Sequence, residues 1–257
     1  MIKEELRNKR IGETRKSNEN LTMTIIEYRN AKDMDVLFEN GYIAKHVQYD
    51  KFKHGKVRNL IYPTVYGVGF VGVGNHNAFY NGKHTLAYNK WISMLSRIYD
   101  ETYLKKYPTY TECSVCESWH NFQNFAEWFD NNYYVVENEI MTLDKDLLSN
   151  KNNKIYSPNT CCFLPQNINN LLVKSDGIRG KYPLGVSYDK DRKKYTSHVT
   201  KKNKKVFLGR YNTPEEAFYV YKREKEKYVK EVADQYKDTI PSHVYNALYA
   251  YEVEITD

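Results

Sequence analysis

Basic, hydroxyl, imidazole and aromatic side chains are interleaved along one stretch of the chain, from Lys181 to Lys230. The stretch has fifteen Lys or Arg and six Asp or Glu, a net charge of +9, whereas the whole chain of 257 residues carries +7. Lys and Arg neutralise nucleic-acid phosphates, and hydroxyl, imidazole and aromatic groups contact base edges. A charge cluster alone is usually a solvated surface. The prediction of nucleic-acid binding therefore depends on the elements that place these groups.

Two runs with the period of β-strands separate these side chains into two faces. Tyr195, Ser197 and Val199 point one way in the first run, and Val206 and Leu208 share a face in the second. The side chains that alternate with them are Thr196, His198, Thr200, Lys205 and Phe207. A Lys-Asn-Lys turn at 202–204 joins the runs as a hairpin. We expect a small antiparallel sheet with a polar and basic outer face.

A helix is predicted directly after this hairpin. Thr213-Pro214-Glu215-Glu216 has the pattern of a capping box with proline at the first helical position. The side chains that the helix turns toward the sheet are predicted to be Ala217, Phe218, Val220, Tyr221, Tyr228 and Val229. The module is therefore a short meander covered by one amphipathic helix.

The motifs of this module follow one another with a known order and spacing. They are Gly185-Val186, Lys194-Tyr195, Val206-Phe207-Leu208-Gly209 and Thr213-Pro214-Glu215-Glu216-Ala217. This part of the chain, about one fifth of it, resembles the APETALA-two (ethylene-response-factor) DNA-binding domain. The resemblance implies that a three-stranded sheet enters the major groove of double-stranded DNA while the helix supports it from behind.

The resemblance also implies which residues face DNA. They are Ser187, Lys193, Lys194, Thr196, His198, Thr200, Lys205, Phe207 and Arg210. The family prefers Arg or Trp at several of these places, and Ser187, Thr200 and Phe207 depart from that preference. The resemblance therefore implies DNA binding but no particular base sequence.

The middle of the chain carries a second set of motifs. They are Val115-Cys116, Trp119, Phe122 and Phe125, then Leu143-Asp144-Lys145, Tyr156-Ser157-Pro158, Cys161, Gln166 and Asn169-Asn170. This segment resembles divergent HNH endonucleases of phages and mobile elements, whose ββα-metal finger has the order strand, loop, helix. Among homing-type endonucleases an HNH-like nuclease joined to an APETALA-type domain is a recurring arrangement.

The HNH resemblance implies a site for one divalent metal, Mg or Mn, that polarises the scissile phosphate. The implied catalytic residues are Asp144, Lys145 and Asp146, and the implied metal ligands are Asp144 with Asn159 or Thr160. Lys145 stands where the family has a general-base His, and Thr160 where it has Asn. Beside two aspartates Lys145 is expected to stay charged and to contact phosphate. His120, His84 or His76 could then supply the base.

Two functions follow from these patterns. The first is a metal-dependent, site-specific endonuclease or nickase, and the alternative is a DNA-binding regulator that keeps the HNH-like segment as an inactive scaffold. Metal-dependent cleavage of DNA would distinguish the endonuclease from the regulator.

The four cysteines allow two interpretations. Cys113 and Cys116 have the spacing of a zinc knuckle, and Cys161-Cys162 could supply the second half of a structural zinc site. Adjacent cysteines chelate one tetrahedral ion poorly, so small buried residues are the favoured interpretation and zinc the minor one. Four cysteines in a chain of this size do not suggest a disulfide framework.

The predicted fold class is α+β in several modules. We expect a flexible arm over 1–20, a β-rich domain over 21–74, an HNH-like domain with two aromatic helices over 75–175, the sheet-and-helix module over 181–237, and a tail over 238–257. The glycines of 67–74 lack the G-x-G-x-x-G spacing of a dinucleotide site. No run approaches the ~20 apolar residues of a membrane span. We expect an intracellular protein of a phage-infected cell, with double-stranded DNA as its partner; the sequence does not reveal any protein partner it has.

Overall fold

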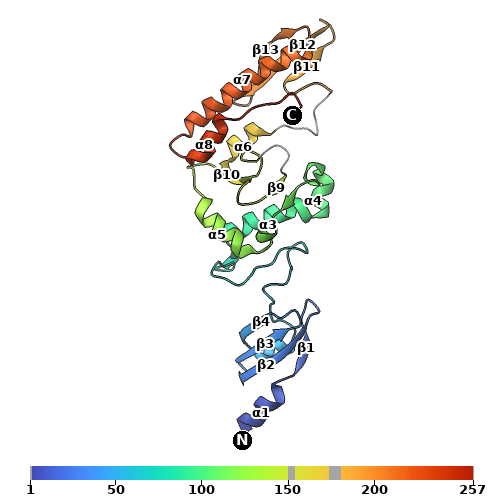
Figure 1. Ribbon diagram of the computed structural model, residues 1–257, viewed down its shortest axis with the longest axis vertical. Coiled ribbons are helices and arrows are strands. Elements are labelled where there is room, and N and C mark those ends of the chain that lie inside the picture. Colours follow the sequence, from blue (N-terminus) through green and yellow to red (C-terminus); the bar gives the residue numbers. More distant parts are fainter. Residues whose placement is uncertain (1, 150–153, 174–180, 257) are drawn as a thin grey trace. The chain divides into compact units, whose positions relative to one another are not determined.

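The computed structural model describes residues 2–149, 154–173 and 181–256 (Figure 1). The fold is a mixture of α and β, as predicted. The chain divides into two compact units, residues 1–88 with 117–126 and residues 89–116 with 127–257. The segment expected to form one HNH-like domain, 75–175, therefore contributes to both units. None of the helices in the described part of the chain has the length and apolar character needed to cross a membrane.

The first unit is built around a four-stranded antiparallel sheet. Its strands, in spatial order, are β1 (Thr14–Lys16), β2 (Thr22–Asn30), β3 (Asp33–Phe38) and β4 (Ile43–Val47). Along β3 every second residue is buried, as period-2 alternation requires when one face meets a core. The helix α2 (Tyr49–Lys53) closes this core with Phe52, which is fully buried.

Residues 1–20 are not the flexible arm that the sequence predicted. They form the helix α1 (Ile2–Arg10) and the strand β1, which pairs antiparallel with β2. Arg10 bonds Glu13 at 2.9 Å and places its guanidinium 4.2 Å from the Tyr49 ring, so the helix end is tied to the sheet domain. Polar contacts hold this segment, which is why an apolar pattern did not reveal it.

The glycine-rich segment 67–74 serves close packing. A Cβ atom on Gly72 would lie 1.9 Å from the Asn121 side chain, and one on Gly74 would lie 2.3 Å from Gln123. Gln123 Nε2 donates to the carbonyl groups of Val71 and His76. The segment is thereby fixed against the residues that begin the helix α5 (Phe122–Asn132).

A short hairpin follows in the first unit. It consists of β5 (Phe79–Tyr80) and β6 (Lys83–His84), paired antiparallel around Asn81-Gly82. Both turn residues have positive φ, +48° and +74°, as a two-residue type I′ turn requires. The helix α3 (Leu86–Tyr99) begins two residues later.

The central part of the second unit brings distant segments into two small sheets. The remaining elements of this region are α4 (Glu101–Lys106), η1 (Pro108–Tyr110), β7 (Ser114–Val115), β8 (Met141–Asp144), β9 (Ile155–Tyr156), β10 (Cys162–Pro165) and α6 (Gln166–Leu172), while η2 (Glu117–His120) belongs to the first unit. β8 pairs antiparallel with β10, and β7 pairs parallel with β9. α6 contacts both β10 and β8. β8, β10 and α6 thus follow one another along the chain and pack together.

The predicted three-stranded antiparallel sheet is present near the C-terminus. It has the order β11 (Val186–Asp189), β12 (Lys194–Lys201), β13 (Lys204–Tyr211), and α7 (Pro214–Gln235) lies along one face (Figure 1). The capping box forms as predicted, because Thr213 accepts from the Glu216 N–H while the Glu216 carboxylate accepts from the Thr213 N–H. Phe218 and Tyr221 pack against Val199 beneath the sheet.

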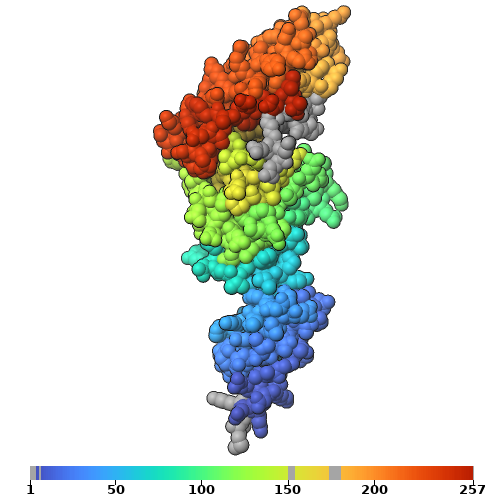
Figure 2. Space-filling model, in the orientation of Figure 1, coloured from blue at the N-terminus to red at the C-terminus, as the bar shows by residue number. Residues whose placement is uncertain are grey.

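Residues 238–257 are more than a tail. They contain the helix α8 (Ser242–Tyr249), which contacts α7, and Val253, which is buried in the core between sheet and helix. Lys222 of α7 donates to the Val253 carbonyl at 2.7 Å. In Figure 2 these residues are drawn in red beside the orange surface of α7. The module therefore extends to the end of the described chain.

Candidate functional site

The face of the β11–β13 sheet opposite α7 collects most of the residues expected to meet DNA. Cross-strand pairing places Ser187 beside Thr196 and Thr196 beside Arg210, His198 beside Phe207, and Thr200 beside Lys205. These seven side chains form what we call the open face. Lys194 lies on the same side by alternation, and its ammonium group bonds the Asn212 side chain. Lys193 occupies the β11–β12 turn with φ +51°.

A β-bulge sets the centre of the open face. The register shifts between Ser197, which pairs with Gly209, and His198, which pairs with Phe207. The extra residue, Leu208, packs into the core beneath the sheet while Phe207 stays 49% exposed. Gly209 has φ +141°, a conformation that glycine adopts readily at such a bulge. The bulge therefore turns Phe207 outward and Leu208 inward.

Phe207 lies between a neutral and a charged nitrogen group. Its ring centroid is 5.3 Å from that of His198 and 4.9 Å from the Arg210 guanidinium carbon. Burial lowers the pKa of His198, and the charges of Lys205 and Arg210 lower it further. The imidazole is therefore neutral near pH 7, with one nitrogen that donates and one that accepts. Its buried Nδ1 has no hydrogen-bond partner in the described part of the chain.

The cations of the open face differ in how far they are neutralised. Arg210 lies 3.4 Å from the Asp189 carboxylate, at the limit of a weak ion pair. Lys205 is exposed and has no ion pair with any described residue. In contrast, Lys201 at the end of the central strand β12 pairs with Glu224 of α7 at 2.5 Å. Lys205 is therefore the side chain best placed to contact a phosphate.

Two of the residues expected to read DNA, Ser187 and Thr196, are hydrogen-bonded to each other. The hydroxyl oxygens of Ser187 and Thr196 lie 2.9 Å apart, and Thr196 also donates to the Ser187 carbonyl. Thr196 is only 7% exposed. We therefore revise the assignment of Thr196, because its hydroxyl stabilises the β11–β12 pair and has little surface left for a ligand.

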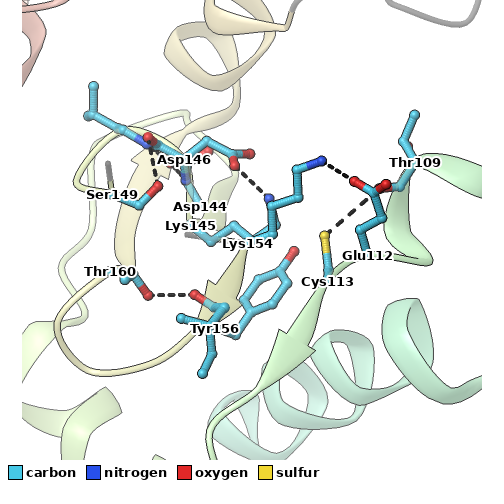
Figure 3. A network of polar contacts seen from close by, with 12 residues as sticks. Thr109, Glu112, Cys113, Asp144, Lys145, Asp146, Ser149, Lys154, Tyr156 and Thr160 are labelled. Atoms are coloured by element: carbon cyan, nitrogen blue, oxygen red, sulfur yellow. Dashed lines mark hydrogen bonds and ion pairs between the residues drawn. The ribbon is translucent and has the colours of Figure 1, made fainter. Parts of the chain in front are cut away.

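The expected catalytic loop follows β8 (Figure 3). Asp144 is 8% exposed, and its Oδ2 accepts hydrogen bonds from the N–H groups of Asp146 at 2.9 Å and Leu147 at 2.8 Å. Burial raises the pKa of Asp144, although these two N–H groups oppose the shift. Oδ1 has no hydrogen-bond partner among the residues that the structure describes. One oxygen thus closes a turn, and the described structure leaves the other available to a ligand.

Lys145 cannot act as the general base of this loop. Burial lowers the pKa of Lys145, but the hydrogen bond and charge of Asp146 outweigh that effect, and the net shift is upward. The ammonium group lies 2.5 Å from Asp146 Oδ1 and 5.8 Å from the centroid of the Tyr156 ring. The hydrogen bond and charge of Asp146 thus favour the charged form of Lys145, which is the form expected from the sequence.

The two further metal ligands expected from the resemblance are not brought into a ligand set. Thr160 is buried, and its hydroxyl donates to the Ile155 carbonyl at 2.6 Å and accepts from the Ser157 N–H. It is therefore committed to the turn between β9 and β10. Asn159 is exposed, and no contact joins it to the aspartates in the described structure. Of the residues that the resemblance names, the described structure leaves only Asp144 Oδ1 and the Asp146 carboxylate as oxygen ligands, so this set does not fit an HNH metal site.

An open pocket of about 650 Å³ lies beside this loop. Its lining includes Asp144, Lys145 and Asp146 together with Arg97, Tyr156 and Asn169. Arg97 was not predicted as a site residue. It projects from α3 to the Leu143 carbonyl at 3.5 Å and the Tyr156 hydroxyl at 3.4 Å, and only the fold shows that it reaches the loop.

The expected histidine alternatives belong to the first unit, whereas this loop belongs to the second. His76 precedes the β5–β6 hairpin, His84 ends β6, and His120 ends η2. Of the described residues, one trio of potential ligands lies within 4.8 Å, Asp33, Asp35 and His46. Arg29 bonds both carboxylates and holds the pKa of Asp33 down at about 2, so a guanidinium already neutralises this trio.

The cysteines do not form the zinc site that was one interpretation of the sequence. No three of the four thiols, all of them in the described structure, lie within 4.8 Å of one another. Cys161 and Cys162 are buried at adjacent positions of the β9–β10 region, and burial raises the pKa of Cys161 to about 12. These two are protonated packing residues.

The chain matches no protein-family model, no curated protein and no solved structure. Its function therefore has to be argued from the geometry of the open face and of the loop after β8.

Proposed function

We propose that the chain is a sequence-specific double-stranded DNA-binding protein that reads the major groove with the open face of the β11–β13 sheet. The observation that carries the proposal is Phe207, exposed at the bulge between the neutral His198 and the cationic Arg210. This grouping offers an apolar ring for thymine methyl groups, an imidazole for base edges and a guanidinium for guanine.

The rest of the module supports this role. α7 covers the opposite face, so the sheet is held rigid from one side and exposed on the other. The net charge of +9 between Lys181 and Lys230 attracts phosphates, and Lys205 stands at the edge of the reading residues without a carboxylate partner among the described residues. Lys205 is thereby assigned to phosphate contact, and Phe207, His198 and Arg210 are assigned to base readout.

The test begins with selection of a preferred sequence from random duplex DNA by the full-length protein. Selection is then repeated with His198→Ala, Phe207→Ala and Lys205→Ala. We expect the first two to change the selected sequence, with losses of about 1–3 kcal/mol on the original site, and the third to weaken all sequences alike. Val206→Ala is the control, because Val206 is similarly exposed but lies on the other face. Altered selection by Val206→Ala with none by Phe207→Ala would show that the wrong face was assigned.

The loop after β8 supports a scaffold role within this DNA-binding protein. Thr160 and Asp144 Oδ2 stabilise turns, and Lys145 remains a cation. An ammonium group beside an open pocket suits phosphate contact better than proton abstraction.

A metal-dependent nuclease is the second candidate function. One observation favours it: the free Asp144 Oδ1 and Asp146 line the same pocket of about 650 Å³. The test is nicking of a supercoiled plasmid that carries the selected site, in Mg²⁺ or Mn²⁺, by wild type and Asp144→Ala at equal occupancy. Nicking that disappears in Asp144→Ala supports the nuclease. If the wild-type protein nicks the plasmid with neither ion, the nuclease is excluded and the DNA-binding regulator is the supported function.

A further inference from the structure

The first unit has its own asymmetry of charge. Between Asp50 and Asp100 the chain has no acidic residue, although the 32 Asp and Glu among 257 residues would place about six in a segment of this length. The same segment carries seven Lys or Arg and three His, and five of these Lys or Arg residues lie in the first unit. It is drawn in blue to green in Figure 2. Because the segment has no carboxylate side chains, none of its own charges would repel a polyanion such as DNA.

The cations of the first unit fall into two groups. Before Asp50 the arginines are neutralised, as in the ion pairs of Arg7 with Glu27, Arg10 with Glu13 and Arg29 with Asp33. After Asp50 the exposed cations have no carboxylate partner in the described structure; they are Lys51, Lys53, Lys56, Arg58 and Lys83. Their charge is directed to solvent.

Exposed aromatic rings accompany these unpaired cations. On the β5–β6 hairpin Phe79 is 48% exposed and Tyr80 is 72% exposed, directly before the turn that leads to Lys83. Large rings in water cost free energy unless a ligand covers them. The combination of a ring and a free ammonium group at one turn suits a nucleic-acid ligand.

The hairpin is anchored to the core by a series of ring contacts. The ring centroid of Phe79 is 4.6 Å from that of His84 and 5.8 Å from that of Tyr88, and Tyr88 lies 5.1 Å from the buried Phe122. Burial raises the pKa of Tyr88, and the charge of Arg58 opposes the shift. Phe79 is thus anchored to the core, and Lys83 lies across the turn, paired with Tyr80.

We infer that the β5–β6 hairpin is a second DNA-contacting surface, in which Phe79 and Tyr80 pack on sugars and base edges of duplex DNA while Lys83 and Arg58 neutralise phosphates. The identity of the ligand rests on the proposed function, but the surface belongs to a different unit from the open face. A protein partner fits less well, because protein interfaces are depleted of Lys and their cations meet carboxylates.

The experiment measures affinity and salt dependence of full-length protein on a duplex that contains the selected site with long flanks. Tyr80→Ala is compared with Tyr80→Phe and with Tyr219→Ala, which removes a ring that is 62% exposed on α7. We expect Tyr80→Ala to weaken binding at least five-fold, and the other two to change it less than two-fold. Circular dichroism and thermal unfolding check that each variant is folded.

A second comparison, of Lys83→Ala with Lys32→Ala, tests whether the charge of Lys83 contributes to DNA binding. Both remove from the first unit an exposed lysine that has no ion pair with a described residue, but Lys32 lies in the β2–β3 turn outside the acid-free segment. We expect Lys83→Ala to reduce the slope of log affinity against log salt by about one, and Lys32→Ala to leave it unchanged.

The outcomes separate this inference from the proposed function. Unchanged affinity and slope in both Tyr80→Ala and Lys83→Ala overturn the second surface, whatever Phe207→Ala does. Weakened binding in these variants together with an unaffected Phe207→Ala supports the hairpin and overturns the open face as the reader. Wild type that binds no DNA overturns both.

Discussion

The ammonium group of Lys145 lies 2.5 Å from Asp146 Oδ1, in the loop where the resemblance implies a metal. The Lys145 side chain is 8% exposed and the Asp146 side chain 73%. The lysine of this ion pair is therefore buried, whereas the aspartate faces solvent. A cation is therefore built into this loop, and it shares a carboxylate that a divalent metal would need.

Replacement of Lys145 tests what that cation does. Lys145→His removes the ammonium group and supplies a base with a pKa near neutrality. If the loop is a nuclease site, we expect plasmid nicking in Mn²⁺ to persist or increase. If Lys145 contacts phosphate in a scaffold, we expect weaker DNA binding and no nicking, and Lys145→Arg should restore binding. Plasmid nicking and fluorescence anisotropy are measured on the same preparations.

Asp144 is expected to stabilise its turn through a carbonyl-type oxygen and not through its charge. Asp144→Asn keeps an oxygen that accepts from the Asp146 and Leu147 N–H groups and removes a buried charge, so its free energy of unfolding should equal or exceed that of wild type at pH 7. Asp144→Ala leaves both N–H groups without that acceptor and should lose about 1–2 kcal/mol. Urea unfolding measures both. Equal losses in the two variants would mean that the charge itself stabilises the turn.

Salt dependence separates phosphate contacts from internal ion pairs. Lys205→Ala should reduce the slope of log affinity against log salt by about one, because each neutralised phosphate releases counterions. Lys201→Ala removes the same charge from the same hairpin, but Lys201 already pairs with Glu224. Its slope should stay near that of wild type. Equal slopes for Lys205→Ala and wild type would exclude Lys205 as a phosphate contact.

The sequence predicted best where local chemistry decides the structure. The capping box at Thr213 and Glu216 formed as predicted, because its hydrogen bonds join residues three apart. The alternation of β12 and the Lys202-Asn203 turn, with φ +47° and +59°, are equally local. These features fix the three-stranded sheet and its helix.

The sequence predicted least where distant residues meet. Thr160 stands at a motif position, but its hydroxyl is used within the turn of residues 155–160. Arg97 reaches the loop after β8 across 46 residues of sequence. The register shift at Ser197 and His198 depends on how Leu208 packs under the sheet. A period-2 pattern in the sequence does not predict where such a shift occurs. Tertiary packing therefore decided the candidate site.

Lys225 gives the second unit a pH-dependent stability. Its Nζ lies 2.6 Å from the Leu171 carbonyl, and burial lowers the pKa of Lys225 to about 8. The unfolded chain then binds more protons than the folded one between about pH 8 and 10.5, so this group adds stability as pH rises through that window. Below about pH 8 the burial of its charge is a constant cost.

Lys225→Met should therefore raise the free energy of unfolding by about 1–3 kcal/mol at pH 7, and by less at pH 10. Urea unfolding at the two pH values checks this. Lys227→Met is the control, because Lys227 is exposed on the same helix and should show no pH-dependent gain. A loss of stability in Lys225→Met at pH 7 would show that the bond to Leu171 outweighs the cost of burial.

Gly185 is expected to control how closely α7 approaches the sheet. It has φ +73°, and a Cβ atom there would lie 2.1 Å from the Tyr221 ring. Gly185→Ala should therefore lose about 2–4 kcal/mol, from backbone strain together with the clash. Gly67 has the same φ, but a Cβ atom there would meet no heavy atom within 4 Å, so Gly67→Ala should cost only about 1 kcal/mol.

A double-mutant cycle isolates the clash with Tyr221. In a Tyr221→Ala background there is space for the new methyl group, so Gly185→Ala should cost only the strain of about 1 kcal/mol. Unfolding free energies and DNA affinities are measured for the four proteins of the cycle, and affinity should fall together with stability because α7 supports the open face. The same loss in both backgrounds would show that strain alone requires the glycine, and that Tyr221 does not set the distance between α7 and the sheet.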